Sequence, residues 1–275
     1  MKLLNIGCGS VFHHSWSNID VLSSSPEVQT YDIKKGLPYA DSYFNACYSS
    51  HLLEHLTQTE AEKFLLECWR ILQPQAVIRI VVPDLEAIVI NYLEVLEKSQ
   101  TDKSEEANYK WIILELYDQA VRSFSGGEMG HYLSNNNIEN KEFIVARIGQ
   151  EAEKYWWQQE NNIKTSIWEK IKSKKPEWFF KTFRIGVAKV LVKLVAGQEA
   201  KQAFEEGLFR NTGEIHRWMY DRFSLKCMLE QSGFVDVKVC RSDESQIPNF
   251  NSYGLDMVDN KIRKPDSLFM EAIKP

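Results

Sequence analysis

The first residues that could do chemistry form a short glycine loop. Gly7-Cys8-Gly9 directly follows Leu3 to Ile6, an apolar run that predicts a β-strand. Glycines at such a turn let the backbone approach a ligand closely and adopt conformations that other residues avoid. In an open α/β sheet, ligands bind beyond the carboxyl ends of the strands. The sequence therefore predicts a ligand site at this loop, although a tight turn alone would also account for its two glycines.

Two aspartates stand at the ends of the next two predicted strands. Asp20 lies in the run Asn18 to Val21, and Asp32 lies in the run Val28 to Ile33. An acid at the first position can hold ribose hydroxyls, and an acid at the second can accept from an adenine amino group. The sequence lacks both the P-loop pattern and the third glycine of a dinucleotide fingerprint. The loop and the aspartates together therefore favour a nucleoside ligand without a pyrophosphate.

A histidine cluster follows the fourth predicted strand. His51, Glu54 and His55 are spaced three and four residues apart, so a helical turn would place them on one face. His51 is nearest to the strand end and is the candidate catalytic base. The alternative is that these side chains have only a structural role, as helix caps or as partners of neighbouring groups. Two histidines four residues apart can share a metal ion, but the glutamate is not at the zincin position and a third ligand is not evident. We therefore predict no metal site.

His216 is the second candidate catalytic residue. It lies four residues before Tyr220, near the end of a long helical segment that could fold over a ligand site as a lid. Packing of this histidine on the core beside Trp218 fits the sequence equally well.

Alternating strands and helices must position these residues. One helix is expected to begin with a capping box of Thr59 and Glu62 and to end before Pro74, and another to begin with Asp84 as its N-cap. Apolar and β-branched runs predict the strands. The seven predicted strands are Leu3 to Ile6, Asn18 to Val21, Val28 to Ile33, Ala46 to Ser50, Val77 to Val82, Phe234 to Val239 and Ser267 to Ile273.

Between residues 92 and 213 the sequence shows helical periodicity without a strand signal. We therefore predict an α/β fold, a doubly wound, mostly parallel, seven-stranded Rossmann-like sheet with a helical insertion after the fifth strand. Residues 1–91 and 214–275 would form the core, and residues 92–213 the insertion or cap. Only seven residues separate Gly9 from Ser17, whereas a helical crossover needs about a dozen, so we expect the first crossover helix to be a turn or lost.

Composition narrows the class of protein. The chain has 275 residues, 44% hydrophobic and 26% charged, as is usual for globular chains. A net charge of −5 argues against nucleic acid as the main partner, and no run is apolar enough to predict a membrane span. The five cysteines are scattered and the chain starts as a strand rather than a signal peptide, so we expect a reduced, cytoplasmic protein.

A basic amphipathic stretch indicates contact with a membrane surface. From Lys164 to Lys193 there are nine basic and two acidic residues, and within 178–195 the apolar side chains share one helical face. This pattern is typical of a helix that lies in a membrane interface, which would make the protein peripheral to the inner face of a membrane. Packing against its own protein is the alternative.

Six segments of the chain carry motifs of a known family: Asn5 to Gly9, Trp16 to Asp20, Tyr31 to Phe44, Tyr48 to Leu56, Glu67 to Asp84 and His216 to Phe234. Together they resemble the class I S-adenosylmethionine-dependent methyltransferases of the small-molecule type 11 group, over about residues 1–90 and 214–275. Two positions depart from the group's pattern, because the third glycine of the loop is missing and Gln75-Ala76 stands where a glycine pair is usual.

The resemblance implies an enzyme that transfers the methyl group of S-adenosylmethionine to an oxygen atom of a small-molecule, saccharide or lipid-linked acceptor. The alternative is a non-catalytic methyltransferase-like module that binds a membrane surface or a protein partner through its helical insertion. By this resemblance, the methionine part of the cofactor would contact Gly7, Cys8 and Gly9, and the ribose would contact Asp20. The adenine would contact Asp32 and Ile33, and the methyl group would lie near Ser49 and His51.

Overall fold

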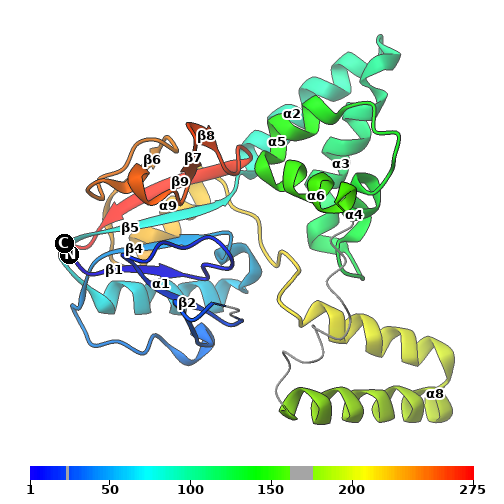
Figure 1. Ribbon diagram of the computed structural model, residues 1–275, viewed down its shortest axis with the longest axis horizontal. Helices are drawn as coiled ribbons and strands as arrows, with labels where there is room; N and C mark the ends of the chain where they lie inside the picture. Colours follow the sequence, from blue (N-terminus) through cyan, green and yellow to red (C-terminus); the bar gives the residue numbers. More distant parts are fainter. Residues whose placement is uncertain (23–24, 162–175) are drawn as a thin grey trace.

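A seven-stranded sheet forms the centre of the computed structural model, which describes residues 1–22, 25–161 and 176–275, and only the backbone at 176–178 and 181. The strands are β1 (Leu3–Ile6), β2 (Ser17–Asp20), β3 (Val28–Thr30), β4 (Phe44–Ser50), β5 (Leu72–Pro83), β6 (Val235–Cys240) and β9 (Ser267–Ile273). Their order is β3-β2-β1-β4-β5-β9-β6 (Figure 1). Only β9 runs antiparallel to its neighbours among these described strands, so the predicted mostly parallel sheet is confirmed.

Two helices, α1 (Gln58–Ile71) and α9 (Arg222–Gln231), cover one face of the sheet. The predicted helix before Pro74 is confirmed, but its predicted capping box is wrong by two residues. The side chain of Thr57, not Thr59, caps the helix, and Glu60 bonds back to the backbone of Thr57. Leu56, just before the cap, and Ala61 both enter the core, and such a pair fixes where a helix begins.

Loops and turns cover the opposite face. Residues 241–266 include the short helix η4 (Phe250–Tyr253) and a hairpin of β7 (Met257–Val258) and β8 (Lys261–Ile262). Ile247, Phe250 and Leu255 of this segment pack with Tyr48 and Val81 of the sheet. Residues 7–16 are all described and form turns, so the expected loss of the first crossover helix is confirmed.

A buried arginine joins the segment 241–266 to the sheet. Arg79 of β5 is fully buried, and its guanidinium donates to Asp256 Oδ2 at 2.8 Å and to Glu271 Oε1 at 2.9 Å. The hydroxyl of Tyr48 donates to the other oxygen of Asp256 at 2.5 Å. This arrangement satisfies each charge, which a buried ion needs in order not to destabilise the fold.

The helices between β5 and α9 lie at the edge where the parallel strands end (Figure 1). Asp84 accepts from the backbone of Glu86 and Ala87, which confirms the predicted N-cap. Trp111 centres one small core of this region and Ile112 contributes to another. The helices are α2 (Leu85–Ser99), α3 (Glu106–Val121), α4 (Gly127–Leu133), α5 (Lys141–Ile148), α6 (Gln150–Glu160) and α8 (Pro176–Arg210).

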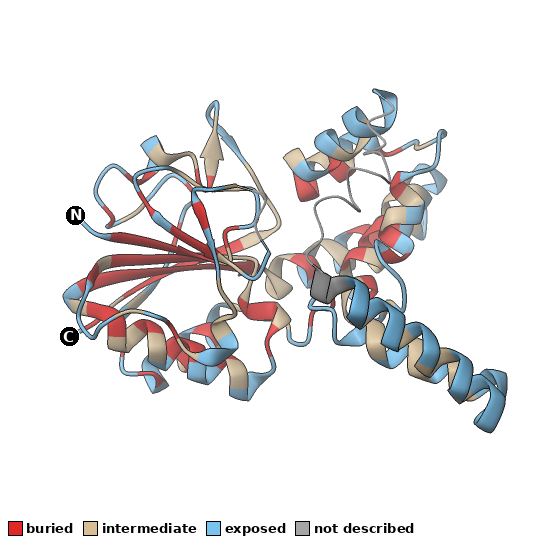
Figure 2. Cartoon of the chain, turned by 60° about the horizontal axis from the view of Figure 1, so that its bottom comes forward, coloured by how far each residue is buried: buried red, intermediate tan, exposed pale blue. Residues whose placement is uncertain are grey.

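The helix α8 is a hairpin of two arms, because Gly197 has a non-helical conformation with φ 89°. Its described side chains are exposed or half-buried along both arms (Figure 2). Part of the basic stretch predicted from Lys164, namely 164–175, lies outside the described residues. Among the described helices, none has the length and apolar character that crossing a membrane requires.

Candidate functional site

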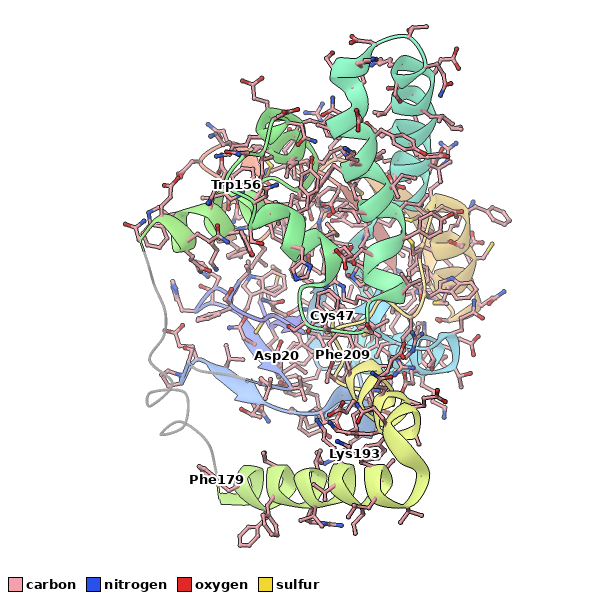
Figure 3. All side chains as sticks on the ribbon, turned by 90° about the vertical axis from the view of Figure 1, so that its right-hand side faces the viewer. Asp20, Cys47, Trp156, Phe179, Lys193 and Phe209 are labelled. Carbon is pink, nitrogen blue, oxygen red and sulfur yellow. The ribbon has the colours of Figure 1, made fainter. Side chains whose placement is uncertain are left out.

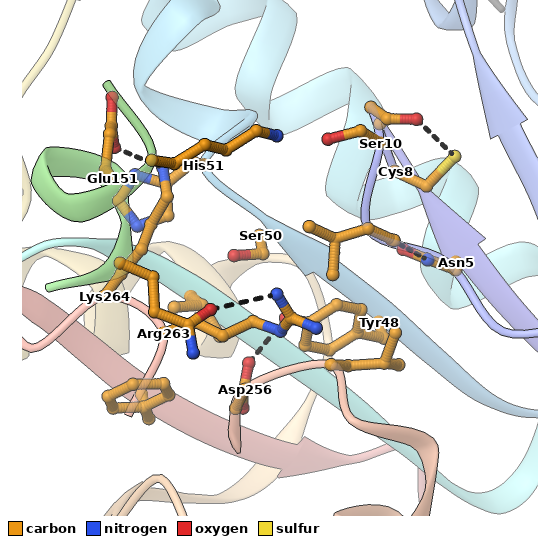
Figure 4. Close-up of a pocket in the computed structure, with 18 residues that line it drawn as sticks. Asn5, Cys8, Ser10, Tyr48, Ser50, His51, Glu151, Asp256, Arg263 and Lys264 are labelled. Carbon is orange, nitrogen blue, oxygen red and sulfur yellow. Dashed lines mark hydrogen bonds and ion pairs between the residues drawn. The ribbon is translucent and has the colours of Figure 1, made fainter. Parts of the chain in front are cut away.

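A cavity of about 420 Å³ lies beyond the ends of β1 and β4 (Figure 4). The glycine loop forms one wall, and the end of β4 with His51 forms another. Residues from the segment 241–266 and from α6 close the remaining sides. The lining residues include Asn5, Gly7, Cys8, Gly9, His51, Glu151, Lys154, Asp256, Arg263 and Lys264.

The two glycines of the loop have different surroundings. Both have positive φ, 69° at Gly7 and 53° at Gly9, a region that glycine adopts without strain. A Cβ at Gly7 would lie 3.0 Å from two methyl carbons of Leu52, whereas a Cβ at Gly9 would meet no described atom within 4 Å. Gly7 therefore allows close packing inside the protein, whereas Gly9 lines the cavity and has open space where a side chain would begin.

The carboxylate of Asp20 holds the glycine loop in place. It accepts from the backbone N–H of Gly9 at 2.9 Å and from that of Leu22 at 2.9 Å. Asp32 is the N-cap of a short helix, η1 (Ile33–Lys35), and accepts from the backbone of Lys34. Both aspartates thus have local structural partners, and their ribose and adenine roles stay predictions.

Three other predicted contacts differ in how they face the cavity. Cys8 lines it, and burial, helped by Asp20, raises the pKa of the thiol to about 11, so Cys8 stays protonated and is no nucleophile. Ile33 packs against the core instead. Ser49 is buried, and its hydroxyl has no hydrogen-bond partner within the described part of the chain.

His51 lines the cavity, and its ring makes two side-chain contacts. Its backbone has φ 51°, which is rare for a residue with a side chain. Its Nε2 lies 2.8 Å from the hydroxyl of Ser267, and its Nδ1 lies 3.2 Å from Oε1 of Glu54. The side chain is 13% exposed, so it can still meet a ligand in the cavity.

Glu54 is fully buried among histidines. Burial alone would raise its pKa, but His51, followed by His216 and His55, outweighs burial and lowers the pKa to about 2. Burial lowers the pKa of His216 to about 3 despite the charge of Glu54. At neutral pH the carboxylate is therefore ionised and His216 is neutral.

The structure does not bring His216 into the cavity with His51. His216 lines a separate hollow with Trp218, and its ring centroid lies 4.9 Å from that of His55. Its predicted catalytic role on the substrate side stays a prediction, with the geometry favouring a contact to Glu54 over one to a ligand in the main cavity.

Sequence reasoning missed the cationic wall of the cavity. Arg263 donates to the carbonyl of Gly254 at 2.8 Å and to Oε1 of Gln150 at 3.3 Å. Lys264 pairs with Glu151 at 3.5 Å. Adjacent cations just before the last strand were the available signal, but neither helical nor strand periodicity connects them with α6.

The start of α6 packs directly on this wall. A Cβ at Gly149 would lie 2.6 Å from Cδ of Pro265 and 2.7 Å from the carbonyl oxygen of Arg263, so only glycine allows the contact. Gln150, Glu151 and Lys154 then line the cavity from the helical side. The start of helix α6 thus contributes to the wall of the cavity, and the role of the helical segment as a lid stays a prediction.

Comparison with known proteins finds one family model that matches part of the chain and several solved structures with low similarity. Residues 4–80 match the family model described as a methyltransferase domain. A SAM-dependent methyltransferase from Archaeoglobus fulgidus is similar at 13% identity and TM-score 0.40, over 99% of this chain and 86% of that one. A chain in the complex of the Haloferax volcanii Trm112 methyltransferase activator with a methyltransferase is similar at 9% identity and TM-score 0.40, over 100% and 82%. The comparison with curated proteins gave no match.

Proposed function

We propose that this chain, whose residues 4–80 match the methyltransferase domain family model, is an S-adenosylmethionine-dependent enzyme that methylates an oxygen of a small-molecule, saccharide or lipid-linked acceptor. The observation that supports it is the cavity in which the glycine loop and His51 face a wall with Lys154, Arg263 and Lys264. Within this proposal, residues 1–91 and 214–275 are the catalytic core, and residues 92–213 supply the cap on the acceptor side.

The residues of the loop fit the cofactor. Gly9 leaves room where a Cβ would stand, at the carboxyl end of β1. Asn5 lines the cavity, and its buried Oδ1 has no hydrogen-bond donor in the described ranges, so it can accept from a polar ligand. S-adenosylmethionine supplies an electrophilic methyl group when bound. We assign Gly7, Cys8 and Gly9 to its methionine part, Asp20 to its ribose, and Asp32 with Ile33 to its adenine.

His51 is proposed as the base for the acceptor hydroxyl. Its Nδ1 faces the ionised Glu54, which stabilises the ring once it carries a second proton. The proton from the acceptor goes to Nε2, which now contacts Ser267 and must exchange that contact for the acceptor. General base catalysis of this kind contributes about 10²–10⁴-fold in rate.

The cationic wall supports an acceptor that carries a phosphate or a carboxylate. Arg263 already has two hydrogen-bond acceptors, which fix the guanidinium in place before a ligand arrives. Lys264 is balanced by Glu151, whereas Lys154 also lines the cavity. Acceptors with an anionic group should therefore bind more tightly than their neutral analogues.

Calorimetric titration with S-adenosylmethionine and S-adenosylhomocysteine tests the cofactor assignment. We expect binding of both, weakened by about 1–3 kcal/mol in Asp20→Ala through lost charge-assisted hydrogen bonds. Asp102→Ala, which removes an exposed aspartate cap in the helical region, is the matched control and should bind as the wild type does. Folded protein that binds neither ligand would favour the non-catalytic alternative.

Methyl transfer from labelled S-adenosylmethionine to pools of sugar phosphates or extracted lipids tests the base. His51→Gln should lower the turnover by about 10²–10⁴-fold with little change in cofactor affinity. The reverse pattern, weak cofactor binding with normal turnover at saturation, would make His51 a binding residue instead.

A lipid-linked acceptor is favoured by the first arm of α8 (Figure 3). Its exposed apolar side chains include Phe180 at 72%, Phe183 at 71% and Leu194 at 76% exposure. Arg184 and Lys193 on the same arm can contact anionic headgroups. We propose that this arm lies on an anionic membrane surface.

Vesicle sedimentation tests this contact. The wild type should pellet with phosphatidylglycerol vesicles and stay in solution with phosphatidylcholine vesicles, and Phe180→Asp with Phe183→Asp should abolish pelleting. Phe223→Asp, at an equally exposed phenylalanine of α9, is the control and should leave pelleting unchanged. Equal pelleting of all variants would remove the membrane assignment and leave the methyl transfer untouched.

A further inference from the structure

Glu54 presents an unusual buried carboxylate. The residue is fully buried, and neither carboxylate oxygen has a hydrogen-bond donor among the residues that the structure describes. His51 Nδ1 comes within 3.2 Å of Oε1, as an ion pair without the alignment of a hydrogen bond. A buried carboxylate without donors is costly and calls for a cation or another positive partner.

Two imidazoles complete a ligand set around this carboxylate. Glu54, His55 and His216 each offer one ligand atom, and these atoms all lie within 4.8 Å of one another. Tetrahedral ligands at about 2.0–2.2 Å from one ion lie about 3.3–3.6 Å apart, so the three side chains would have to draw closer together on binding. We propose that Glu54, His55 and His216 bind a divalent transition-metal ion, with Zn²⁺ as the closest chemical fit.

The surroundings of His55 prepare it as a ligand. Its Nδ1 lies 3.1 Å from the carbonyl oxygen of Ile215, which fixes the proton on Nδ1 and leaves Nε2 free. Metal-binding histidines commonly use their second nitrogen in this way. Two imidazole nitrogens and one carboxylate oxygen suit zinc and similar ions, whereas calcium and magnesium prefer oxygen ligands throughout.

The ligands come from two parts of the chain that meet at the junction of the core and the helical region. Glu54 and His55 lie in the turn η2 (Leu53–His55) after β4, and His216 lies in the segment that returns from α8. The backbone N–H groups of Arg217 and Trp218 both donate to the carbonyl of Glu54, and that of His216 donates to Gln119 of α3. A bound ion would fasten the return segment to the core, a role in stability that does not depend on the proposed methyl transfer.

This set differs from the pair that the sequence pattern offered. The spacing drew attention to His51 and His55, but His51 contacts the hydroxyl of Ser267 and Oε1 of Glu54 and is not one of the three proposed ligands. The third ligand, His216, stands 161 positions after His55 in the printed sequence, so only the fold reveals it.

Metal titration of the full-length protein after treatment with a chelator tests the proposal. We expect one Zn²⁺ per chain, a rise in melting temperature on binding, and visible absorption bands when Co²⁺ replaces zinc. His216→Ala and His55→Gln should each weaken binding by more than the roughly 10–100-fold that removal of an outer-shell partner causes. The neighbouring histidines His13 and His14, with ring centroids 4.2 Å apart, provide the control; His13→Ala with His14→Ala should leave binding unchanged.

Two outcomes would overturn the site. Absence of cobalt bands and of a thermal shift in the wild type would mean that histidine protons, rather than an ion, balance Glu54. Binding that survives in His55→Gln and disappears in the His13 and His14 variant would mean an adventitious surface ion only. If His216→Ala does not fold, the wild-type cobalt spectrum and His55→Gln still decide. If the wild type binds zinc but transfers no methyl group, only the proposed function is refuted.

Discussion

Replacing Gly7 and Gly9 by alanine, one at a time, should separate packing from ligand access in the glycine loop. Both glycines have positive φ, 69° and 53°, where a Cβ costs about 1–2 kcal/mol. At Gly7 the new Cβ would also lie 3.0 Å from Leu52, and overpacking of a well-packed site costs about 1–3 kcal/mol more. We expect Gly7→Ala to lower the free energy of unfolding by about 2–5 kcal/mol, and Gly9→Ala by about 1–2 kcal/mol.

Cofactor affinity should change in the opposite order. Gly9 lines the cavity and has open space where a Cβ would stand, so we expect the methyl group of Gly9→Ala to compete with the ligand that we assign there. Urea unfolding measures the first quantity, and calorimetric titration with S-adenosylhomocysteine measures the second, at a temperature where both variants are folded. The reasoning is refuted if Gly9→Ala binds as tightly as the wild type while Gly7→Ala does not, or if Gly9→Ala is the less stable variant.

Three further changes test the fold by urea unfolding. Gln75→Gly should raise the free energy of unfolding by about 1 kcal/mol, because Gln75 has φ 65°, a conformation that glycine adopts without strain. The control Gln29→Gly, at an exposed position of strand β3, should lower it by about 0.5–1 kcal/mol. If both variants lose the same amount of stability, Gln75 is not strained. Arg79→Met should lower the free energy of unfolding by about 3–5 kcal/mol, because it leaves the buried carboxylates of Asp256 and Glu271 without their partner. An unchanged stability would mean that the two carboxylates become protonated at little cost. Thr57→Ala should cost about 1 kcal/mol through loss of the cap, and Thr59→Ala almost nothing; the opposite order would restore the cap predicted from the sequence.

Local patterns predicted most of the sheet. The bounds of β1 and β9 match the predicted runs residue for residue, because short apolar runs with turn residues at both ends define a buried strand. The cap of α1 was misplaced because Thr57 with Glu60 and Thr59 with Glu62 both fit the capping pattern. Core packing of Leu56 decides between them, and that is a tertiary contact.

The buried charges depend on register, which the sequence does not specify. Arg79 stands in the middle of one apolar run and Glu271 in the middle of another, which hints at a buried pair. Only the antiparallel register of β5 and β9 places them opposite each other. Asp256 and Arg263 come from a segment without periodicity, so neither the ion pair nor the cavity wall could be derived from a pattern.

The segment 241–266 compensates for the missing crossover helix. Residues 7–16 form turns rather than a helix, and Ile247, Phe250 and Leu255 pack on the face of the sheet that this connection leaves uncovered. Arg79 holds this segment on the sheet through its ion pair with Asp256. The same segment then supplies cations to the cavity. A right-handed crossover from β1 to β2 would place its helix on this same face of the sheet, where the segment 241–266 now packs. The short connection therefore leaves room for Arg263 and Lys264 to reach the cavity, where we propose that they meet the acceptor.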